Sequence, residues 1–406
     1  MNTIAHTNNQ TKYTFTVILL CIGYFVDFYD LTIFSASYVN TFRDLFHITD
    51  TNQIQKLYLY ISSIYTLGIF TGAILFGILG DKFGRSIIIR YSILIYSIAM
   101  LLSVVSSSVY FFTLLRFISG FGLATEFATS SVLINELFTS HKASIYNSYL
   151  YLCGILGGIT ATYLSGVSWQ LMYILGGVIG IIIFFLRKNI YESLVFINID
   201  KNISKGQILQ LFNSKDKIIK FIRLLILIIP FNFLIVTMFM FPKFMNIHED
   251  LAYLIKILLF GFFMGNVIST LMCRYIINRF KSHKVFVLIN ITLFAILIPI
   301  YRYIDNSNYF IYALGLGLLG GGLPTTWIQI VVRDYGANLR NTASNTLFAG
   351  GRLVGMLFNL LIANWILNFN RFNANIIITC IVIVALVLIA IFFTKNNYNQ
   401  DMRYVE

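Results

Sequence analysis

Twelve apolar stretches, each long enough to cross a bilayer, constrain this chain more than any other feature of its sequence. A helix needs about 20 residues to cross a hydrocarbon core of about 30 Å. The chain is 58% hydrophobic and only 11% charged, so it cannot surround a core with a water-soluble surface. Backbone groups inside a bilayer must be hydrogen-bonded within the span, and no ten-residue alternation indicates a barrel. We therefore predict an all-α integral membrane protein.

The predicted spans follow one another through short connections, except between the sixth and the seventh. They cover residues 14–38, 57–80, 86–108, 110–135, 145–167, 169–187, 221–245, 252–276, 284–303, 309–332, 343–367 and 372–394. A polar, lysine-rich segment separates six spans from six. We predict one bundle over residues 1–187, a cytoplasmic linker over 188–220, and a second bundle over 221–406 that ends in a short cytoplasmic tail.

The two halves also show an internal repeat. The matching positions are Asp81-Lys82-Phe83 with Asn278-Arg279-Phe280, Gly154 with Gly351, and Gly120 and Gly122 close to Gly315 and Gly317. A parallel repeat of this kind predicts two pseudo-symmetric six-helix bundles, related by an axis along the membrane normal, with a pathway between them.

The basic residues predict the orientation and exclude several classes of function. Most of the 29 Lys and Arg residues fall on segments that are cytoplasmic if both termini are inside, so the net charge of +13 follows from orientation and contact with anionic lipids. No basic patch lies on a soluble domain, so we expect no nucleic-acid partner. The four cysteines lie in spans without paired spacing, and we expect no metal, cofactor or disulfide. We expect a monomer.

A short charged loop joins the second and third spans. The segment from Gly77 to Arg85 contains Asp81 and a glycine turn at Gly84, and it links two long apolar stretches. With these residues in place it resembles the signature loop of the major facilitator superfamily. Arg116-Phe-Ile-Ser-Gly-Phe-Gly-Leu-Ala-Thr-Glu126 and Asp27-Phe-Tyr-Asp30 are similar to spans four and one of its metabolite:proton symporter and sugar-porter branches.

The resemblance implies the major facilitator fold and secondary transport by alternating access. It also implies a cytoplasmic gate at the ends of spans two, four and eleven. The residues that match this gate are Gly77, Asp81, Gly84, Arg85, Glu136 and Arg340. The alternative for this loop is lipid anchoring and orientation alone, which suits Lys82 better than Asp81.

Charged residues inside the spans are the candidates for proton coupling. A charge near the bilayer centre costs roughly 2.5–3.5 kcal/mol even on a mild scale, so it needs a partner or a wet cavity. In sugar porters a pair that matches Asp30 and Arg116 couples protonation to rocking, so we predict that protonating Asp30 releases Arg116. Glu126 is the second candidate, and Asp27 is placed to face it. The alternatives are a static salt bridge and a packing hydrogen bond.

The second half offers neutral polar and aromatic groups for a substrate. The predicted substrate-binding residues are Asn232, Asn266, Thr326, Trp327, Gln329 and Asn345. Pro324, which follows three glycines, should break or kink span ten near the midplane. The alternative for any one of these residues is hydrogen bonding between helices.

Two transport functions remain open, and a third class lacks support. We favour proton-coupled uptake of a small polar metabolite, such as an amino acid, betaine or organic acid, across a bacterial inner membrane. All acids inside spans lie in the first half, which suits proton handling there. Proton-antiport export of a drug-like solute or siderophore uses the same scaffold. An enzyme would need a nucleophile, a metal site or a soluble domain, and the sequence shows none.

Overall fold

The computed structural model describes residues 2–244, 251–300, 308–366 and 369–406. Within these ranges the regular structure is helical, with no strand. The predicted ends of spans seven, nine and eleven, at residues 245, 301–303 and 367, lie outside the described residues.

The α-helices run the length of the described chain. They are α1 (Asn2–Phe46), α2 (Thr51–Phe83), α3 (Arg85–Val104), α4 (Val109–Leu123), α5 (Glu126–Leu137), α6 (Ser140–Tyr163), α7 (Trp169–Leu186), α8 (Leu194–Ile197), α9 (Lys215–Phe244), α10 (Leu251–Phe280), α11 (His283–Leu297), α12 (Tyr309–Gly320), α13 (Gly322–Asp334), α14 (Arg340–Ile366) and α15 (Phe369–Phe393).

Each of the twelve predicted spans corresponds to a helix or to a pair of consecutive helices. Among the described residues, nine stretches are long and apolar enough to cross a membrane. The three other predicted spans, 145–167, 284–303 and 343–367, correspond to α6, α11 and α14. The helices therefore occur where the hydropathy of the sequence predicts them.

Two of the predicted spans consist of two helices each. Span four ends its first helix at Leu123 and begins α5 at Glu126, which places an acidic side chain in the first turn of that helix. A carboxylate is favourable there because the free N–H groups of a helix start carry partial positive charge. Span ten breaks between α12 and α13, as predicted, but the break falls at Gly321. Pro324 lies in the first turn of α13, where its missing N–H leaves no hydrogen bond unmade.

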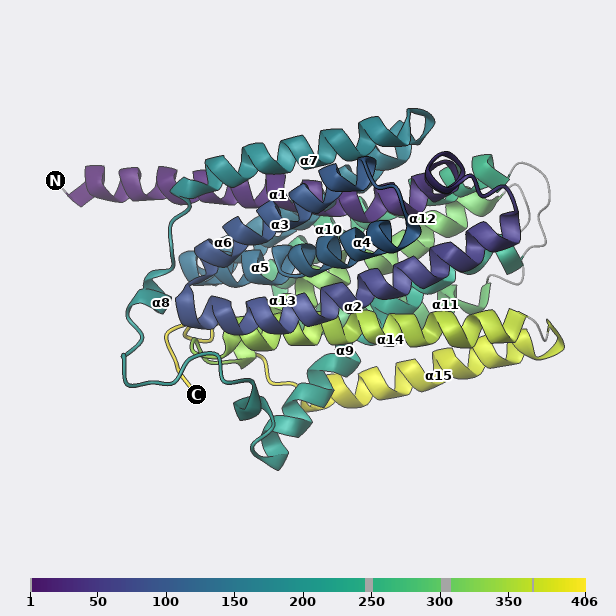
Figure 1. Cartoon of the computed structure of the whole chain (residues 1–406). Helices are drawn as coiled ribbons and strands as arrows, with labels where there is room; N and C mark the ends of the chain where they lie inside the picture. The colour runs from purple at the N-terminus through teal and green to yellow at the C-terminus, as the bar shows by residue number, and fades with distance from the viewer. Residues whose placement is uncertain (1, 245–250, 301–307, 367–368) are drawn as a thin grey trace. The chain divides into compact units, whose positions relative to one another are not determined.

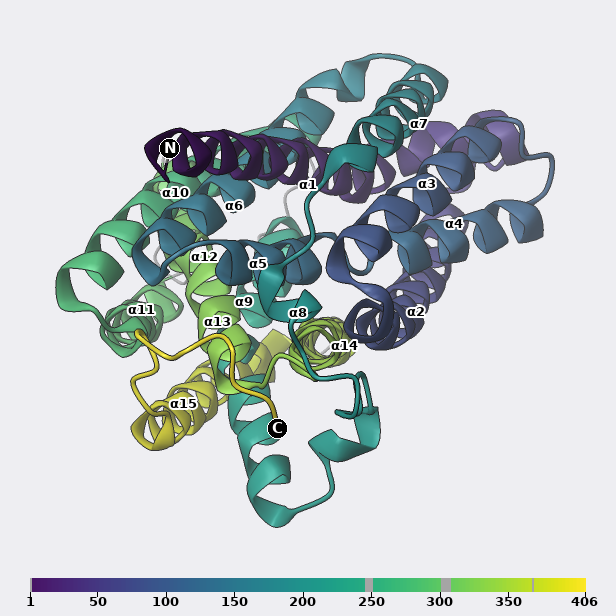
Figure 2. The same ribbon diagram turned by 90° about the vertical axis from the view of Figure 1, so that its left-hand side faces the viewer.

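The described chain forms two compact units. Unit 1 comprises Met1–Ile208, Tyr335–Ala349 and Met402–Glu406, and unit 2 comprises Leu209–Asp334 and Gly350–Asp401. In unit 1 the long helices α1, α2, α3, α6 and α7 run along one another (Figure 1). An end view shows α5 inside this unit, packed against α1, α3 and α6 (Figure 2). The first turns of α14 thus belong to unit 1, although residues 209–334 separate them along the chain from the other helices of that unit. The predicted bundle boundaries remain a prediction.

Each unit contains a close contact between two helices at a glycine, and the two contacts lie at positions that the sequence repeat relates to each other. In unit 1, α4 lies so close to α2 that a Cβ on Gly120 would be 2.4 Å from the carbonyl oxygen of Tyr65. In unit 2, a Cβ on Gly317 of α12 would be 2.1 Å from the carbonyl oxygen of Phe262 on α10. Gly317 follows Gly120, and Phe262 follows Tyr65, by the same number of residues along the chain. Small residues permit such close helix packing in membranes, so the repeat extends from sequence to backbone contact.

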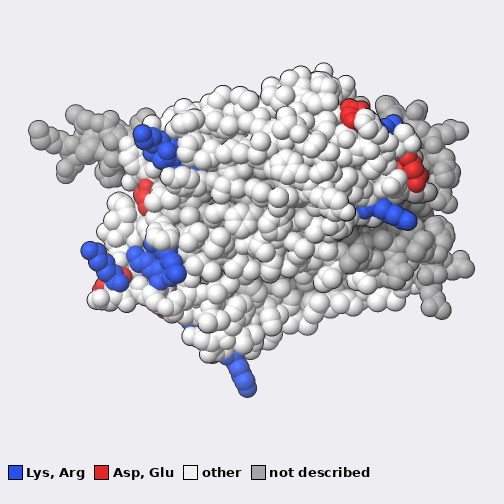
Figure 3. Space-filling view, viewed as in Figure 1, with Lys and Arg blue, Asp and Glu red and all other residues white. Residues whose placement is uncertain are grey.

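Charged side chains are unevenly distributed over the face of the molecule seen in Figure 3. On this face Lys, Arg, Asp and Glu lie mostly toward two opposite ends, basic atoms also project from the lower edge, and a broad uncharged surface separates the two ends. Charged side chains avoid hydrocarbon and collect in the interfacial regions of a bilayer. This distribution matches a chain whose helices cross a membrane.

Candidate functional site

Asp30 of α1 and Arg116 of α4 form an ion pair inside unit 1. The Nη1 of Arg116 donates to Oδ1 of Asp30 at 3.1 Å, and both side chains are fully buried. Ser119 donates from Oγ to the other carboxylate oxygen of Asp30 at 2.8 Å. The structure therefore brings together the two residues that the sequence predicts to pair. It adds the hydroxyl of Ser119, which lies about one helical turn after Arg116 along α4.

Aromatic rings enclose the rest of the Arg116 guanidinium. Its Cζ lies 4.9 Å from the centre of the Phe34 ring, 4.8 Å from that of Tyr65 and 5.7 Å from that of Tyr173. The negative face of an aromatic ring attracts a cation, more strongly where water is excluded. The rings therefore stabilise the arginine charge within the unit, beside the carboxylate of Asp30.

Glu126 pairs with Arg187, the last residue of predicted span six. Nη1 of Arg187 donates to Oε1 at 2.6 Å and Nη2 donates to Oε2 at 2.8 Å, and both side chains are fully buried. This two-point contact is the strongest geometry for a guanidinium and a carboxylate. Ser92 of α3 donates to Oε1 at 3.3 Å. Asp27 of α1 is buried in the same unit. Glu126 thus has a direct partner other than the predicted Asp27.

The Arg187 side chain reaches this position because α1 carries a glycine beside it. A Cβ on Gly23 would lie 1.6 Å from Nη2 of Arg187 and 3.1 Å from Oε2 of Glu126. Arg187 also donates to the carbonyl oxygen of Ile89 on α3 at 2.7 Å. The pair therefore ties the start of α5 and the end of α7 to α1 and α3.

A second polar network lies where α2 meets the start of α14. Both oxygens of Asp81 accept hydrogen bonds from α14. Oδ1 accepts from the Asn341 amide at 3.2 Å, and Oδ2 accepts from the amide and the hydroxyl of Thr342 at 2.7 Å each. The first amides of a helix have no partner within it and carry partial positive charge. Asp81 therefore caps a helix that is distant in sequence, and its carboxylate is suited to the partial positive charge of these amides.

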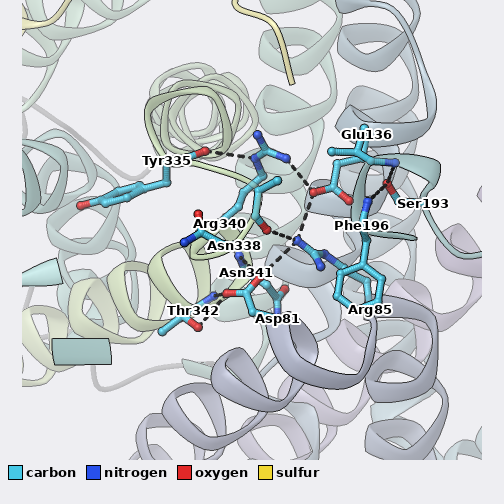
Figure 4. A network of polar contacts seen from close by, with 12 residues as sticks. Asp81, Arg85, Glu136, Ser193, Phe196, Tyr335, Asn338, Arg340, Asn341 and Thr342 are labelled. Atoms are coloured by element: carbon cyan, nitrogen blue, oxygen red, sulfur yellow. Dashed lines mark hydrogen bonds and ion pairs between the residues drawn. The ribbon is translucent and has the colours of Figure 1, made fainter. Parts of the chain in front are cut away.

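Three more charges complete this network, which we call the latch: Asp81, Arg85, Glu136 and Arg340. The Oε1 of Glu136 accepts from Nη1 of Arg340 at 2.7 Å and from Nη2 of Arg85 at 3.2 Å. The same Arg85 nitrogen lies 3.1 Å from Oδ1 of Asp81. All four side chains are fully buried. Figure 4 shows Glu136 lying between the two guanidinium groups.

The remaining predicted gate residues shape the backbone around the latch. Gly84 joins α2 to α3 with a φ of 114°, which favours glycine, and a Cβ there would lie 2.4 Å from Oε2 of Glu192. That Oε2 accepts from the backbone amide of Ser86 at 3.0 Å. The carbonyl oxygen of Gly77 accepts from Nδ2 of Asn341 at 3.0 Å. All six predicted gate residues thus lie in or beside one network.

Several members of these networks were not identified from the sequence. Arg187 was placed at the end of span six without a partner, and no signal distinguishes it from its neighbour Lys188. Asn341 and Thr342 contact Asp81 through backbone amides, which any residue type provides, and their side chains add further bonds to Gly77 and Asp81. The only indication in the sequence is indirect: a buried acid needs a hydrogen-bond donor or a positive charge beside it, so some such partner has to be present.

The predicted substrate-binding residues are buried, and most bond within their own unit 2 helices. Asn232 and Asn266 donate to the carbonyl oxygens four residues before them, at 3.1 and 2.8 Å. Thr326 and Gln329 do the same, at 2.8 and 2.9 Å. Trp327 donates to the carbonyl oxygen of Leu224 at 2.7 Å. The Trp327 bond joins two helices, as the alternative expects, whereas the other four bonds lie within single helices.

The sixth predicted substrate-binding residue belongs to unit 1. Nδ2 of Asn345 donates to Oγ1 of Thr129 on α5 at 3.0 Å. Both residues are buried. Asn345 thus joins the α14 start to α5, one turn beyond the part of the helix that the latch holds.

Comparison with known proteins places the whole chain among transporters. A family model described as Major Facilitator Superfamily matches residues 20–358. The sialic acid transporter NanX of Escherichia coli strain K12 is 23% identical over 326 residues, which cover 78% of this chain and 80% of that protein. The bicyclomycin resistance protein homolog of Haemophilus influenzae is 25% identical over 285 residues, which cover 68% of each chain.

Solved structures show the same architecture. The proton:xylose symporter XylE superposes with a TM-score of 0.77 at 14% identity, over 98% of each chain. This likeness and the family match confirm the predicted fold, an all-α membrane protein of two six-helix bundles.

Proposed function

Because the chain belongs to the Major Facilitator Superfamily and is therefore a multi-pass membrane transporter and not an enzyme, we propose that it takes up a small polar metabolite together with protons. In this proposal it works by alternating access in a bacterial inner membrane, as a monomer with both termini cytoplasmic. The driving force is the proton gradient, and Asp27, Asp30, Arg116 and Glu126 couple it to movement.

The ion pair between Asp30 and Arg116 is the observation that carries this proposal. A buried carboxylate beside a buried guanidinium changes the net charge of its surroundings by a full unit when it takes up a proton. Protonation removes most of the attraction at the 3.1 Å contact and leaves Arg116 held by aromatic rings. Helices α1 and α4 then lose the charged contact that joins them. The static alternative requires the pair to stay charged throughout the transport cycle.

The substrate in this proposal is a small polar molecule such as an organic acid, an amino acid or betaine. The relative NanX is a transporter of sialic acid, which is an organic acid. We retain Asn232, Asn266, Thr326, Trp327, Gln329 and Asn345 as the proposed substrate-binding residues. Amide and hydroxyl groups of this kind, in a mostly apolar surrounding, orient a polar ligand.

Export by proton antiport is the second candidate. The relative of Haemophilus influenzae named as a bicyclomycin resistance protein homolog favours it, because resistance to an antibiotic can result from export. Both directions use the same buried charges. The gradient that drives accumulation distinguishes them.

Proteoliposome transport tests the function and separates the two candidates. Purified protein is screened by thermal shift against small metabolites, and compounds that bind are offered to proteoliposomes under an imposed pH gradient. We expect accumulation when the outside is acidic, and about tenfold at most for one proton and one pH unit. Accumulation only when the inside is acidic would establish antiport. Transport that ignores the pH gradient would overturn proton coupling.

The latch in this proposal holds the cytoplasmic side closed, so neutralising Asp81 should favour the inward-open state. Asp81→Asn weakens the cap on α14, and charged hydrogen bonds of this kind are worth enough to change an equilibrium about tenfold. Ser344 is fully buried in the first turns of α14 and serves as a reporter when replaced by cysteine. We expect a water-soluble maleimide to label Ser344→Cys about tenfold faster in the Asp81→Asn background.

The neighbouring lysine provides the matched control for the latch. Lys82 is exposed, so Lys82→Gln removes a charge at the same helix end without touching the network. It should leave the labelling rate unchanged. Equal labelling in the Asp81→Asn and Lys82→Gln proteins would contradict the gating role and favour lipid anchoring.

A further inference from the structure

The last five residues of the chain lie along the segment that precedes α14. The backbone amide of Ala337 donates to the carbonyl oxygen of Tyr404 at 2.8 Å. Asn338 and Glu406 bond twice, from Nδ2 to the carbonyl oxygen and from the Glu406 amide to Oδ1, at 2.9 Å each. Residues 402–406 and residues 335–340 belong to the same compact unit, although the segments 209–334 and 350–401 of the other unit separate them along the chain from each other and from the rest of it.

These contacts are those of an extended peptide bound along one edge. The carbonyl oxygens that accept hydrogen bonds belong to alternate residues, Met402, Tyr404 and Glu406. The same three residues are half-buried, whereas Arg403 and Val405 between them are exposed. A period of two is typical of extended chain, and peptides bound in this way are held mainly through their backbone.

The segment that receives this peptide is supported from a second side. The amide of Gly206 donates to the carbonyl oxygen of Asn338 at 2.9 Å, and Nδ2 of Asn338 donates to the carbonyl oxygen of Ser204 at 3.2 Å. Asn338 is fully buried. One amide side chain thus joins the linker and the chain end to the segment before α14.

The bound peptide also contacts a member of the latch directly. The Arg340 guanidinium donates from Nη2 to the carbonyl oxygen of Met402 at 3.0 Å, while Nη1 donates to Glu136 at 2.7 Å. Its Nε donates to the carbonyl oxygen of Tyr335 at 3.2 Å. A guanidinium is a planar fork, so fixing two of its nitrogens fixes the direction of the third.

We propose that Met402–Glu406 is an internal peptide ligand of residues 336–340, which positions Arg340 for Glu136 and must dissociate before the latch opens. Asn338 and the peptide are positioning groups, since they act through Arg340. The inference rests on the gating role in the proposed function, but its test requires no substrate. Its failure would leave proton-coupled transport untouched, and the failure of transport would leave this test unaffected.

A chain that ends at Asp401 tests the proposal against the full-length protein. Two quantities are measured: hydrogen exchange of the backbone amides of residues 337–342, and maleimide labelling of the Ser344→Cys reporter. We expect both to be about tenfold faster in the shortened chain, as for an equilibrium that loses the net contribution of a hydrogen bond or two. The synthetic peptide Met-Arg-Tyr-Val-Glu, added in excess, should restore the full-length rates, and a scrambled peptide should not.

A point substitution displaces the peptide without shortening the chain. A Cβ on Gly336 would lie 2.6 Å from the Glu406 amide nitrogen, so Gly336→Ala should reproduce the effect of truncation. Gly166→Ala is the matched control, because a Cβ there meets nothing within 4 Å. It should retain full-length rates in both measurements.

The outcomes separate positioning from simple packing of a tail. Faster exchange together with faster labelling, reversed by the peptide, supports the proposal. Faster exchange with unchanged labelling of Ser344→Cys would overturn it, since the tail would then cover residues 336–340 without controlling the latch. Unchanged rates in both measurements, or equal rescue by the scrambled peptide, would overturn it as well.

Discussion

Replacing Asp30 with Asn should abolish uphill accumulation of the substrate and leave exchange of substrate across the membrane intact. Asn has nearly the same shape as Asp and can still accept from Arg116, but it cannot bind and release a proton in the cycle. When the outside solution is acidic and one proton is coupled to each substrate, the wild-type protein should raise the inside-to-outside ratio of substrate up to about tenfold for each unit of pH difference. The Asp30→Asn protein should only equilibrate it. Proteoliposome uptake measures the first quantity, and counterflow of labelled substrate measures the second.

A second variant at the same contact controls for damage to the fold. Ser119→Ala removes the 2.8 Å hydrogen bond to Asp30 without removing its charge. It should reduce the rate of uptake but retain the accumulation ratio. If Asp30→Asn protein accumulated substrate to the wild-type ratio, Asp30 would not be the coupling group and the pair with Arg116 would be a static salt bridge. Loss of counterflow as well as accumulation would contradict the expected separation of coupling from transport.

The largest effect on stability is expected at Arg187. Replacing it with Met leaves the carboxylate of Glu126 buried without its two-point partner and removes the hydrogen bond to Ile89. Breaking a buried pair by removing one partner costs about 3–5 kcal/mol, because the remaining charge is left uncompensated. The free energy of unfolding, measured by denaturant titration in detergent micelles, should fall by this amount.

Two further proteins make this prediction specific to the buried pair. The double variant Arg187→Met with Glu126→Gln removes the orphaned charge, so it should recover a large part of the lost stability. Lys188→Met removes the neighbouring basic side chain, which is exposed, and should change stability by less than about 0.5 kcal/mol. An Arg187→Met protein as stable as the Lys188→Met protein would contradict the ion pair.

The helices themselves could be predicted from the sequence because a bilayer imposes a length and a composition on every span. Hydropathy placed a helix at each predicted span, and the glycine repeat indicated the duplicated packing that joins α2 to α4 and α10 to α12. The break in span four was not predicted. No proline or run of glycines marks Ala124 and Thr125, and the sequence there reads as continuous helix.

The candidate site was predictable to the extent that charge inside a membrane is expensive. This cost singled out Asp27, Asp30, Arg116 and Glu126, and the structure buries all four. The partner of Glu126 was not predictable, because it depends on a gap beside Gly23 through which the Arg187 side chain passes. The contribution of Met402–Glu406 was not predictable either, because backbone hydrogen bonds leave no signature in residue type.

The sequence by itself determined that this protein crosses a membrane many times, that its halves are repeats, and which buried charges need partners. Each follows from a rule that acts on residue type, since hydrocarbon excludes charges and unpaired backbone groups irrespective of the fold. The pairing of Asp30 with Arg116 could be predicted from the family resemblance, and the structure contains it. Only the tertiary structure decided the partners of the other two acids: Arg187 for Glu126, and the first amides of α14 for Asp81. The physical reason is distance. Ion pairs and hydrogen bonds form within about 3 Å, and residues far apart along the chain reach that separation only where packed helices bring them together.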